Sequence, residues 1–264
     1  MVRVTLIQIN LQNSKTKTIK HILKLLNKAG SFEPDIVCMP ELWYPRIVTS
    51  FETEFMPILH AASEYNITII PGAFLERNCE VVTNNNDNNN SSLCISSPVI
   101  ANNGTVSGRQ LKIYPFGSQR KVVKGGAKLQ IFEAEDFRFG IGICYDIVFP
   151  EVARALVNKG ADILFFPSKI RSEGIKPWHM YVQVRALENR IPIAAPNVCG
   201  NNSHKGKSIL VDFNYDNKTD IALPKLRIGS AKEQLLTTDV NLKLVRKIRK
   251  KRFDDISDYR HHLM

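Results

Sequence analysis

The chain has 264 residues, of which 44% are hydrophobic and 23% charged, and these ordinary values argue against wholesale disorder. No apolar run approaches the roughly 18 residues of a membrane span, and the N-terminus lacks the uninterrupted apolar region of a signal peptide. The formal net charge of +11 comes largely from residues 243–252, which hold seven basic and no acidic side chains, so that the charge without them is +4. We therefore expect a globular protein of the cytoplasm with no membrane association.

Apolar patterns predict strands that alternate with helices along the chain. In order, they are a strand at 2–10, a helix at 17–30, a strand at 34–40, a helix at 54–66, strands at 67–76, 108–117 and 137–146, a helix at 150–160, a strand at 161–168, a helix at 178–190 and a strand at 191–200. This order indicates an α/β fold with helices on the faces of a sheet. We expect a single domain over residues 1–264, in which the polar tract at 83–92 forms a loop between two strands.

Cysteine usage and the basic run limit the classes of partner. The five cysteines are scattered and contain no CxxC pair, which argues against a disulfide framework and a zinc ribbon and favours a reducing compartment. The basic run at 243–252 is typical of a solvated face or tail, and no nucleic-acid module with interleaved aromatic residues accompanies it. We therefore expect no nucleic-acid partner.

One cysteine, Cys144, stands at the end of a predicted strand. It follows the apolar residues 137–143 and precedes a helix expected to begin at Pro150. Open α/β sheets present ligand-binding groups at this position, and backbone N–H groups in such a turn lower a thiol pKa and bind an oxyanion. Lone cysteines also commonly act as small buried hydrophobes, and the local pattern leaves both interpretations open.

Two further residues follow the same pattern. Glu41 comes directly after the apolar residues 36–39, where desolvation suits a carboxylate to act as a general base; the alternative is a turn carboxylate that faces water. Lys112 interrupts an apolar strand-like segment, and a buried lysine requires a carboxylate partner; the alternative is a solvent-exposed lysine on an edge strand.

Taken together, these motifs resemble those of the nitrilase superfamily of carbon–nitrogen hydrolases. The resemblance covers nearly the whole chain and rests on "MPELWYP", "LKIYPFG", "GICYDIVFPE" and "WHMYVQVRALENRIPIAAPNVCG". It implies a four-layer αββα sandwich with two central mixed β-sheets. It also implies a homodimer or higher homo-oligomer, in which the tail at about 240–264 contacts a partner subunit, and the sequence near Asp258 and Tyr259 is similar to that pattern.

The resemblance also implies a reaction. Glu41 is expected to take the thiol proton of Cys144, whose thiolate attacks a small linear amide. Lys112 and the backbone N–H of Tyr145 are expected to stabilise the oxyanion. A thioester forms, ammonia leaves, and water activated by Glu41 then releases the acid, so neither a metal nor an organic cofactor is expected.

The chain departs from the family pattern at two positions. Gln119 aligns near a second glutamate that family members commonly carry; glutamine can still form hydrogen bonds, but it supplies no negative charge. Alternatively, Glu133 or Glu135 fills that role through a shifted loop. Val148 stands where many members of the amidase branch carry an arginine, which weakens the case for an anionic substrate.

Several residues are candidates for supporting roles. Asp146 is expected to orient the backbone around Cys144, with simple capping of the following turn as the alternative. Residues 168–178 are expected to line the substrate pocket, with Lys169 and Arg171 either as substrate contacts or as ordinary exposed loop charges. Tyr44 either forms an aromatic wall of the pocket or packs in the core.

Three functions remain open from the sequence. The first is a small-molecule amidase that releases ammonia. The second is an N-carbamoyl amine hydrolase, which would also release carbon dioxide. The third is a non-catalytic binding protein on the same scaffold, which Gln119 keeps open. A papain-like pair of Cys144 and His179 is disfavoured because nothing in the sequence pairs and orients that histidine.

Overall fold

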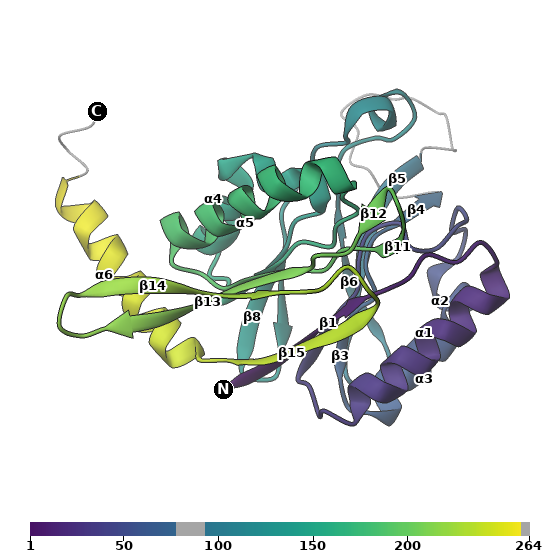
Figure 1. The fold of residues 1–264 in the computed structure, drawn as a ribbon, viewed down its shortest axis with the longest axis horizontal. Coiled ribbons are helices and arrows are strands. Elements are labelled where there is room, and N and C mark those ends of the chain that lie inside the picture. The colour runs from purple at the N-terminus through teal and green to yellow at the C-terminus, as the bar shows by residue number, and fades with distance from the viewer. Residues whose placement is uncertain (78–92, 260–264) are drawn as a thin grey trace.

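The computed structural model describes residues 1–77 and 93–259, except for the side chains of Asn201 and of residues 255–259. Two large mixed sheets pack face to face, and helices cover both outer faces (Figure 1). The architecture is the four-layer αββα sandwich that the sequence resemblance implies. The predicted loop at 83–92 lies outside the described residues.

The first sheet has the strand order β15-β1-β2-β3-β5-β4, with β6 also paired to β5. Strands β1, β2 and β3 are parallel, so their carboxyl ends lie at the same edge. Helices α1 and α3 pack on its outer face. The elements are β1 (Val2–Gln8), α1 (Lys15–Gly30), β2 (Ile36–Cys38), α2 (Phe51–Glu54), α3 (Met56–Glu64), β3 (Thr68–Ile70), β4 (Phe74–Arg77), β5 (Leu93–Ile100), β6 (Val106–Leu111) and β15 (Gln234–Val240).

The second sheet has the strand order β14-β13-β10-β9-β8-β7, in which β8, β9 and β10 are parallel. Helices α4, α5 and α6 pack on its outer face. The elements are η1 (Gly117–Lys121), β7 (Ile131–Ala134), β8 (Phe137–Ile141), η2 (Cys144–Val148), α4 (Pro150–Asn158), β9 (Ile163–Phe165), η3 (Ser172–Gly174), α5 (Ile175–Asn189), β10 (Ile193–Ala195), β13 (Ile209–Asp216), β14 (Ile221–Ile228) and α6 (Leu242–Tyr259), with a separate pair formed by β11 (Cys199–Asn201) and β12 (His204–Lys205).

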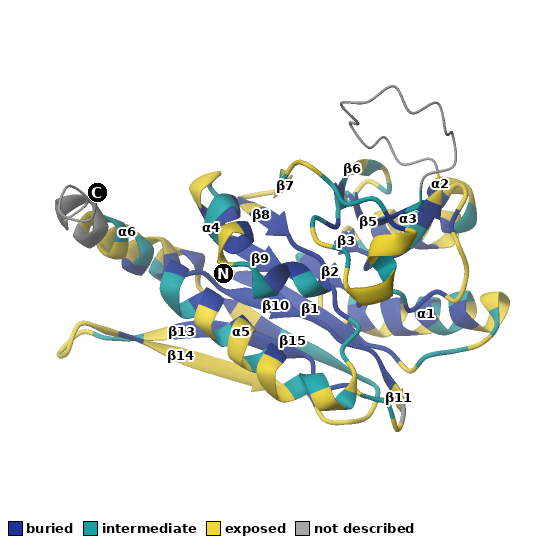
Figure 2. Ribbon diagram, turned by 90° about the horizontal axis from the view of Figure 1, so that it is seen from above, coloured by how far each residue is buried: buried dark blue, intermediate teal, exposed yellow. Residues whose placement is uncertain are grey.

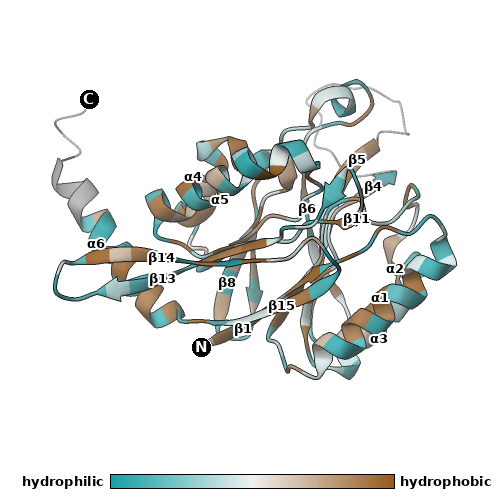
Figure 3. Ribbon diagram, viewed as in Figure 1, coloured by the Kyte–Doolittle hydropathy of each residue, from teal (hydrophilic) through white to brown (hydrophobic). Residues whose placement is uncertain are grey.

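The alternation of side chains along each strand creates the layers. In β9, Ile163 and Phe165 face the other sheet, whereas Leu164 faces the helices. The parallel strands β2, β3, β9 and β10 are therefore wholly buried, whereas the edge strand β14 is mostly exposed and drawn yellow in Figure 2. Apolar residues are frequent along the buried strands in Figure 3. Burial on both faces explains why the sequence of these strands is continuously apolar.

Several predicted elements were wrong in extent; the strand predicted at 191–200, for example, is divided into β10 and β11. The predicted strand at 67–76 is divided into β3 and β4, because Gly72 turns the chain with a φ of +93°. A Cβ atom there would lie 1.9 Å from the carbonyl oxygen of Pro40, so glycine is required at this position. The predicted helix at 54–66 is α3, which begins at Met56 with Pro57 in its first turn, and the short helix α2, which precedes it, was not predicted.

The C-terminal helix α6 carries the basic run and packs on its own domain. Arg246 donates to Asp162 at 2.7 and 2.8 Å, and Arg249 donates to the same carboxylate at 3.3 Å and to the Ala161 carbonyl at 2.7 Å. Burial raises the pKa of Asp162, but these arginines and the N–H of Arg138 outweigh it and lower that pKa overall. Part of the basic run therefore attaches the helix to the sheet. The predicted similarity near Asp258 and Tyr259 concerns side chains that the structure does not describe.

We expect Asp162→Asn to lower the free energy of unfolding by about 2 kcal/mol, because hydrogen bonds to charged groups of this kind contribute about 1.5 to 3 kcal/mol. Urea unfolding measures the loss, and hydrogen exchange is expected to rise within α6. Asp239→Asn is the matched control, since its ion pair with Arg3 is about half exposed and such pairs contribute at most about 1 kcal/mol. Equal losses in the two variants would contradict this account of α6.

Candidate active site

Cys144 lies at a sharp turn between β8 and α4. Its φ is +49°, a left-handed conformation that residues with a Cβ atom rarely adopt and that is common at functional sites. Its backbone N–H donates to the Pro167 carbonyl at 2.9 Å, which fixes the turn against the end of β9. The side chain is 8% exposed and contributes to the wall of a cavity. Cys144 thus belongs to the core between the two sheets and also contributes to the wall of the cavity.

Glu41 and Lys112 meet beside this turn. The Lys112 ammonium donates to Oε1 of Glu41 at 2.6 Å, and the two side chains are 1% and 2% exposed. Glu41 follows β2 and Lys112 follows β6, so the pair joins the ends of two different strands. Lys112 is therefore a buried, paired lysine, not the solvent-exposed edge lysine that the sequence left open.

The electrostatics of the site keep the cysteine as a thiol. Burial, followed by the negative charge of Glu41, raises the pKa of Cys144 well above its ordinary value, although Lys112 and the backbone N–H of Lys169 act in the opposite direction. Burial lowers the pKa of Lys112, but Glu41 and the other nearby anionic groups outweigh it and raise that pKa overall. Lys112 is thus a charged ammonium beside a neutral thiol.

Asp146 lies behind the turn and is completely buried. Its Oδ2 accepts from the N–H of Ile143 at 2.9 Å and from that of Ile113 at 3.3 Å, and its Oδ1 accepts from the N–H of Tyr114 at 2.8 Å. Burial raises the pKa of Asp146 to about 6, and these backbone hydrogen bonds oppose the rise. The carboxylate therefore orients the backbone before Cys144 and also reaches the segment after Lys112.

Gln119 lies at the site, and the alternative glutamates do not. Its Oε1 accepts from the Lys112 ammonium at 3.1 Å and from the N–H of Phe116 at 2.9 Å. Glu133 is exposed and pairs with Arg138, and Glu135 is exposed at a turn. Lys112 thus has one anionic and one neutral oxygen partner from these side chains.

A cavity of about 380 Å³ opens at Cys144. Tyr145, Lys169 and Arg171 contribute to its lining, as do several residues whose side chains are mainly apolar. Lys169 is half-buried and donates to the Leu42 carbonyl at 3.0 Å, and burial lowers its pKa. Arg171 is exposed at the same cavity. The full lining is Phe116, Cys144, Tyr145, Ile147, Val148, Lys169, Ile170, Arg171, Glu173, Gly174, Pro177, Trp178 and Tyr181.

Phe116, Ile147 and Tyr181 also line the cavity, although they lie outside the predicted lining at 168–178. Tyr181 follows Gly174, Pro177 and Trp178 at intervals of three and four residues, which places all four on one face of α5 and the turn before it. That spacing is a signal that the sequence contained. Phe116 gave no such signal, because it lies in an irregular segment and reaches the site by packing on the ring of Tyr145 at 4.8 Å.

Arg185 supports the turn from α5. Its guanidinium donates to the carbonyls of Ile147 at 3.2 Å and Val148 at 2.9 Å, and it pairs with Glu188 one helical turn away. The side chain is 9% exposed. Arg185 therefore supplies hydrogen bonds to carbonyls at the end of η2, which would otherwise lack a hydrogen-bond partner inside the protein.

Tyr44 does not line the cavity, so its role as an aromatic wall is excluded by its position. Its ring packs on Phe55 at 4.8 Å within the core between the first sheet and its helices, and its hydroxyl donates to Glu54 at 2.9 Å. Leu42 turns the chain between Glu41 and Tyr44 with a φ of +47°. The aromatic residues after Glu41 consequently lie in the core and not at Cys144.

Glu54 is expected to stabilise the fold in a pH-dependent manner. Burial raises its pKa, but hydrogen bonds from the Thr49 N–H, the Tyr44 hydroxyl and Lys15 outweigh it and lower that pKa to about 2. A depressed carboxyl pKa contributes stability above about pH 4.5 that is lost as the pH falls towards about 2. We expect Glu54→Gln to cost about 2 kcal/mol at pH 7.

Urea unfolding of wild type and Glu54→Gln at pH 7 and pH 3 tests this expectation. The difference between the two proteins should shrink markedly at the lower pH. A difference of the same size at both values would show that the charge of Glu54 is not what stabilises this corner.

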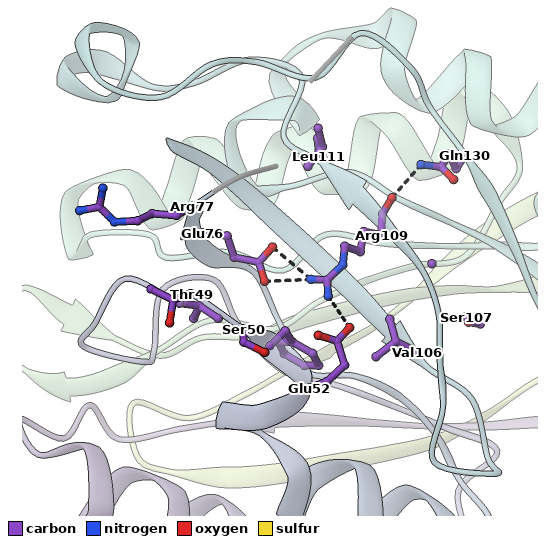
Figure 4. A pocket seen from close by; sticks show the side chains of 13 residues that line it. Thr49, Ser50, Glu52, Glu76, Arg77, Val106, Ser107, Arg109, Leu111 and Gln130 are labelled. Carbon is purple, nitrogen blue, oxygen red and sulfur yellow. Dashed lines mark hydrogen bonds and ion pairs between the residues drawn. The ribbon is translucent and has the colours of Figure 1, made fainter. Parts of the chain in front are cut away.

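A second cavity, of about 700 Å³, lies between α2 and strands β4 and β6 (Figure 4). Arg109 crosses it, bound to Glu76 at 2.9 Å and to Glu52 at 2.7 Å, with its guanidinium over the ring of Phe51. None of Glu41, Lys112 and Cys144 contributes to the lining. Its greater volume therefore does not make it the candidate reaction site.

The other described cysteines differ from Cys144 in their surroundings. Among the described cysteines, Cys38 and Cys199 are also free, whereas Cys94 is disulfide-bonded, contrary to the reducing compartment that the cysteine pattern had suggested. Burial alone raises the pKa of Cys38 well above its ordinary value, and Cys38 does not line the cavity.

Within residues 1–77 and 93–259, no group of three His, Cys, Asp or Glu side chains is placed to hold a metal ion. No helix in the same part of the chain is long and apolar enough to cross a membrane.

The chain is similar to known proteins in sequence and in fold. The family model described as "Carbon-nitrogen hydrolase" matches residues 3–250. A probable nitrilase of Schizosaccharomyces pombe is 32% identical over 148 residues, which cover 55% of this chain and 50% of that protein. An omega-amidase of Xenopus tropicalis is 21% identical over 94% of this chain and 91% of that protein. A carbon–nitrogen hydrolase structure from Helicobacter pylori has a TM-score of 0.78 and 20% identity, over 99% of this chain and 98% of that one.

Proposed function

The chain belongs to the carbon–nitrogen hydrolase family, and from that premise we propose that it hydrolyses a small linear amide through a cysteine thioester. The observation that carries this proposal is the buried Glu41–Lys112 pair beside a thiol that opens onto a cavity. A cavity of about 380 Å³ is suited to a small molecule, since ligand pockets span about 300 to 1,000 Å³. The omega-amidase relative supports an amide as the substrate.

The first half of the reaction forms the thioester. Glu41 removes the thiol proton of Cys144, and the sulfur attacks the amide carbon. The oxyanion that develops is stabilised by the Lys112 ammonium and the backbone N–H of Tyr145. The proton held by Glu41 passes to the amide nitrogen, the C–N bond breaks, and ammonia leaves.

The second half regenerates the thiol. Glu41 takes a proton from water, whose oxygen attacks the thioester carbon, and the same two donors stabilise the second oxyanion. The C–S bond breaks, the acid is released, and the proton returns to the sulfur of Cys144. The charge of Lys112 remains constant throughout, and the two protein groups that exchange protons are Glu41 and Cys144.

The experiment that tests this proposal measures ammonia release from a panel of linear amides, N-carbamoyl amines and nitriles. Turnover of linear amides by wild type, absent in Glu41→Gln, is the expected result. Carbon dioxide released together with ammonia from the carbamoyl compounds alone would assign the carbamoylase alternative instead. No turnover of any class, with Cys144 alkylated no faster than an ordinary cysteine, would favour the non-catalytic binding protein.

We also propose a homodimer that forms beside the cavity. Met180, Tyr181 and Val184 are exposed on α5, and Tyr181 also lines the cavity. Apolar side chains gathered on one exposed helix are typical of an interface. Sedimentation equilibrium should give twice the 29.9 kDa of one chain, and the mass of a single chain would overturn this proposal.

A further inference from the structure

Asp146 connects the two segments that carry the reaction. One is the turn before Cys144, which it reaches through the N–H of Ile143, and the other is the segment directly after Lys112, which it reaches through Ile113 and Tyr114. The two segments are about 30 residues apart in sequence, since Ile143 follows Ile113 by 30 residues and Tyr114 by 29. Within the described structure, these hydrogen bonds make a direct bridge from the nucleophile's turn to the lysine's strand end.

This pattern exceeds what a capping residue requires. A cap of the turn at η2 is complete once the carboxylate accepts from Ile143, its neighbour three residues away. The bonds to Ile113 and Tyr114 satisfy backbone groups of another element, and the carboxylate has no exposure to water. A buried carboxylate is costly unless its hydrogen bonds are made, so the bridge also strongly favours one relative position of the two segments.

We propose that Asp146 is a positioning residue, which sets the distance between the Cys144 thiol and the Lys112 ammonium. The inference goes beyond the proposed function but rests on it, because it assigns the placement of two groups whose roles are proposed above. Asp146 itself does not line the cavity, so it acts through the backbone and not on the substrate. A misplacement of about 1 Å at a reacting centre costs on the order of 100-fold in rate.

The kinetic consequence is specific. Loss of the carboxylate should lower kcat of the amide reaction by about 100-fold, because the oxyanion and its donor no longer meet in the transition state. KM should change less than threefold, since Ile170, Arg171 and Tyr181 still shape the cavity. A residue needed only for folding would instead lower the amount of active enzyme and leave KM and the kcat of the folded fraction unchanged.

The test compares wild type with Asp146→Asn and Asp146→Ser, each of which keeps at least one oxygen acceptor. Asp212→Asn is the matched control, because Asp212 is also a buried carboxylate whose pKa burial raises, on β13 and outside the cavity. Folding is checked by near-ultraviolet circular dichroism and by urea unfolding. The control should keep the wild-type kcat.

A second readout does not depend on turnover. The positive charge of Lys112 lowers the pKa of the Cys144 thiol, so moving that charge away should slow alkylation of Cys144 by iodoacetamide at pH 8 by at least threefold. The proposal is overturned if folded Asp146 variants keep kcat and the alkylation rate within threefold of wild type, or if neither variant folds. Should no amide be turned over by wild type, the proposed function fails while the alkylation rates still decide the role of Asp146.

Discussion

Replacing Cys144 by alanine is expected to abolish amide turnover, with a loss on the order of 10⁶-fold in kcat. The sulfur of Cys144 is the atom that would form the covalent intermediate, and none of the other cysteines that the structure describes lines the cavity. Alanine has the same Cβ atom as cysteine at a φ of +49°, so the substitution adds no new strain to the turn. The stability of the variant should therefore remain close to that of wild type.

Two measurements test this expectation. Steady-state ammonia release is compared among wild type, Cys144→Ala and Cys38→Ala, the last of which removes a buried free thiol outside the cavity and should retain activity. Hydroxylamine added during turnover should yield a hydroxamate with wild type, because it intercepts a thioester. Residual turnover of Cys144→Ala above about one part in 10³ would rule out this cysteine as the nucleophile.

Lys112→Met is the second substitution with a large expected effect. It should lower kcat by about 10²- to 10³-fold, as the loss of one oxyanion donor does in other acyl-transfer sites. It should also lower the free energy of unfolding by about 3 to 5 kcal/mol, because it leaves the Glu41 carboxylate buried without its 2.6 Å partner. Ammonia release and urea unfolding measure the two effects separately.

The double variant Glu41→Leu, Lys112→Met separates folding from catalysis. Replacing both members of a buried ion pair by apolar side chains commonly restores the stability that the single substitution loses. We expect the double variant to recover at least about 2 kcal/mol relative to Lys112→Met and to remain inactive. Recovery of activity along with stability would show that the pair serves only the fold.

The sequence predicted the parts of the site that depend on local composition. Glu41 and Cys144 each follow an apolar strand, and Lys112 interrupts one, so burial was one of two interpretations that the neighbouring residues left open for each, and the family resemblance joined the three into one set. The structure places the three groups around one point, at the ends of strands β2 and β6 and just beyond β8. The layer order was predictable from the resemblance, and the continuously apolar strands agree with it.

Prediction from the sequence was wrong where a single backbone angle decides the direction of the chain. Leu42 and Gly72 adopt positive φ values, and these turns send Tyr44 into the core and divide one predicted strand into β3 and β4. Nothing in the residues around Tyr44 distinguishes a pocket wall from a core aromatic. The bridge made by Asp146 was equally hidden, because its partners Ile113 and Tyr114 become neighbours only after the fold forms.

The pairing of β1 with β15 has a consequence for synthesis of the chain. β1 leaves the ribosome long before its partner strand, because Gln8 pairs with Gln234, which is translated 226 residues later. At about 5 to 20 residues per second, the wait is on the order of 10 to 50 s. During that interval one edge of β1 is an unpaired template to which a neighbouring nascent chain can add a strand. Yield in the cell should therefore depend on chaperones that hold the nascent chain, and slower translation of the final third should increase aggregation.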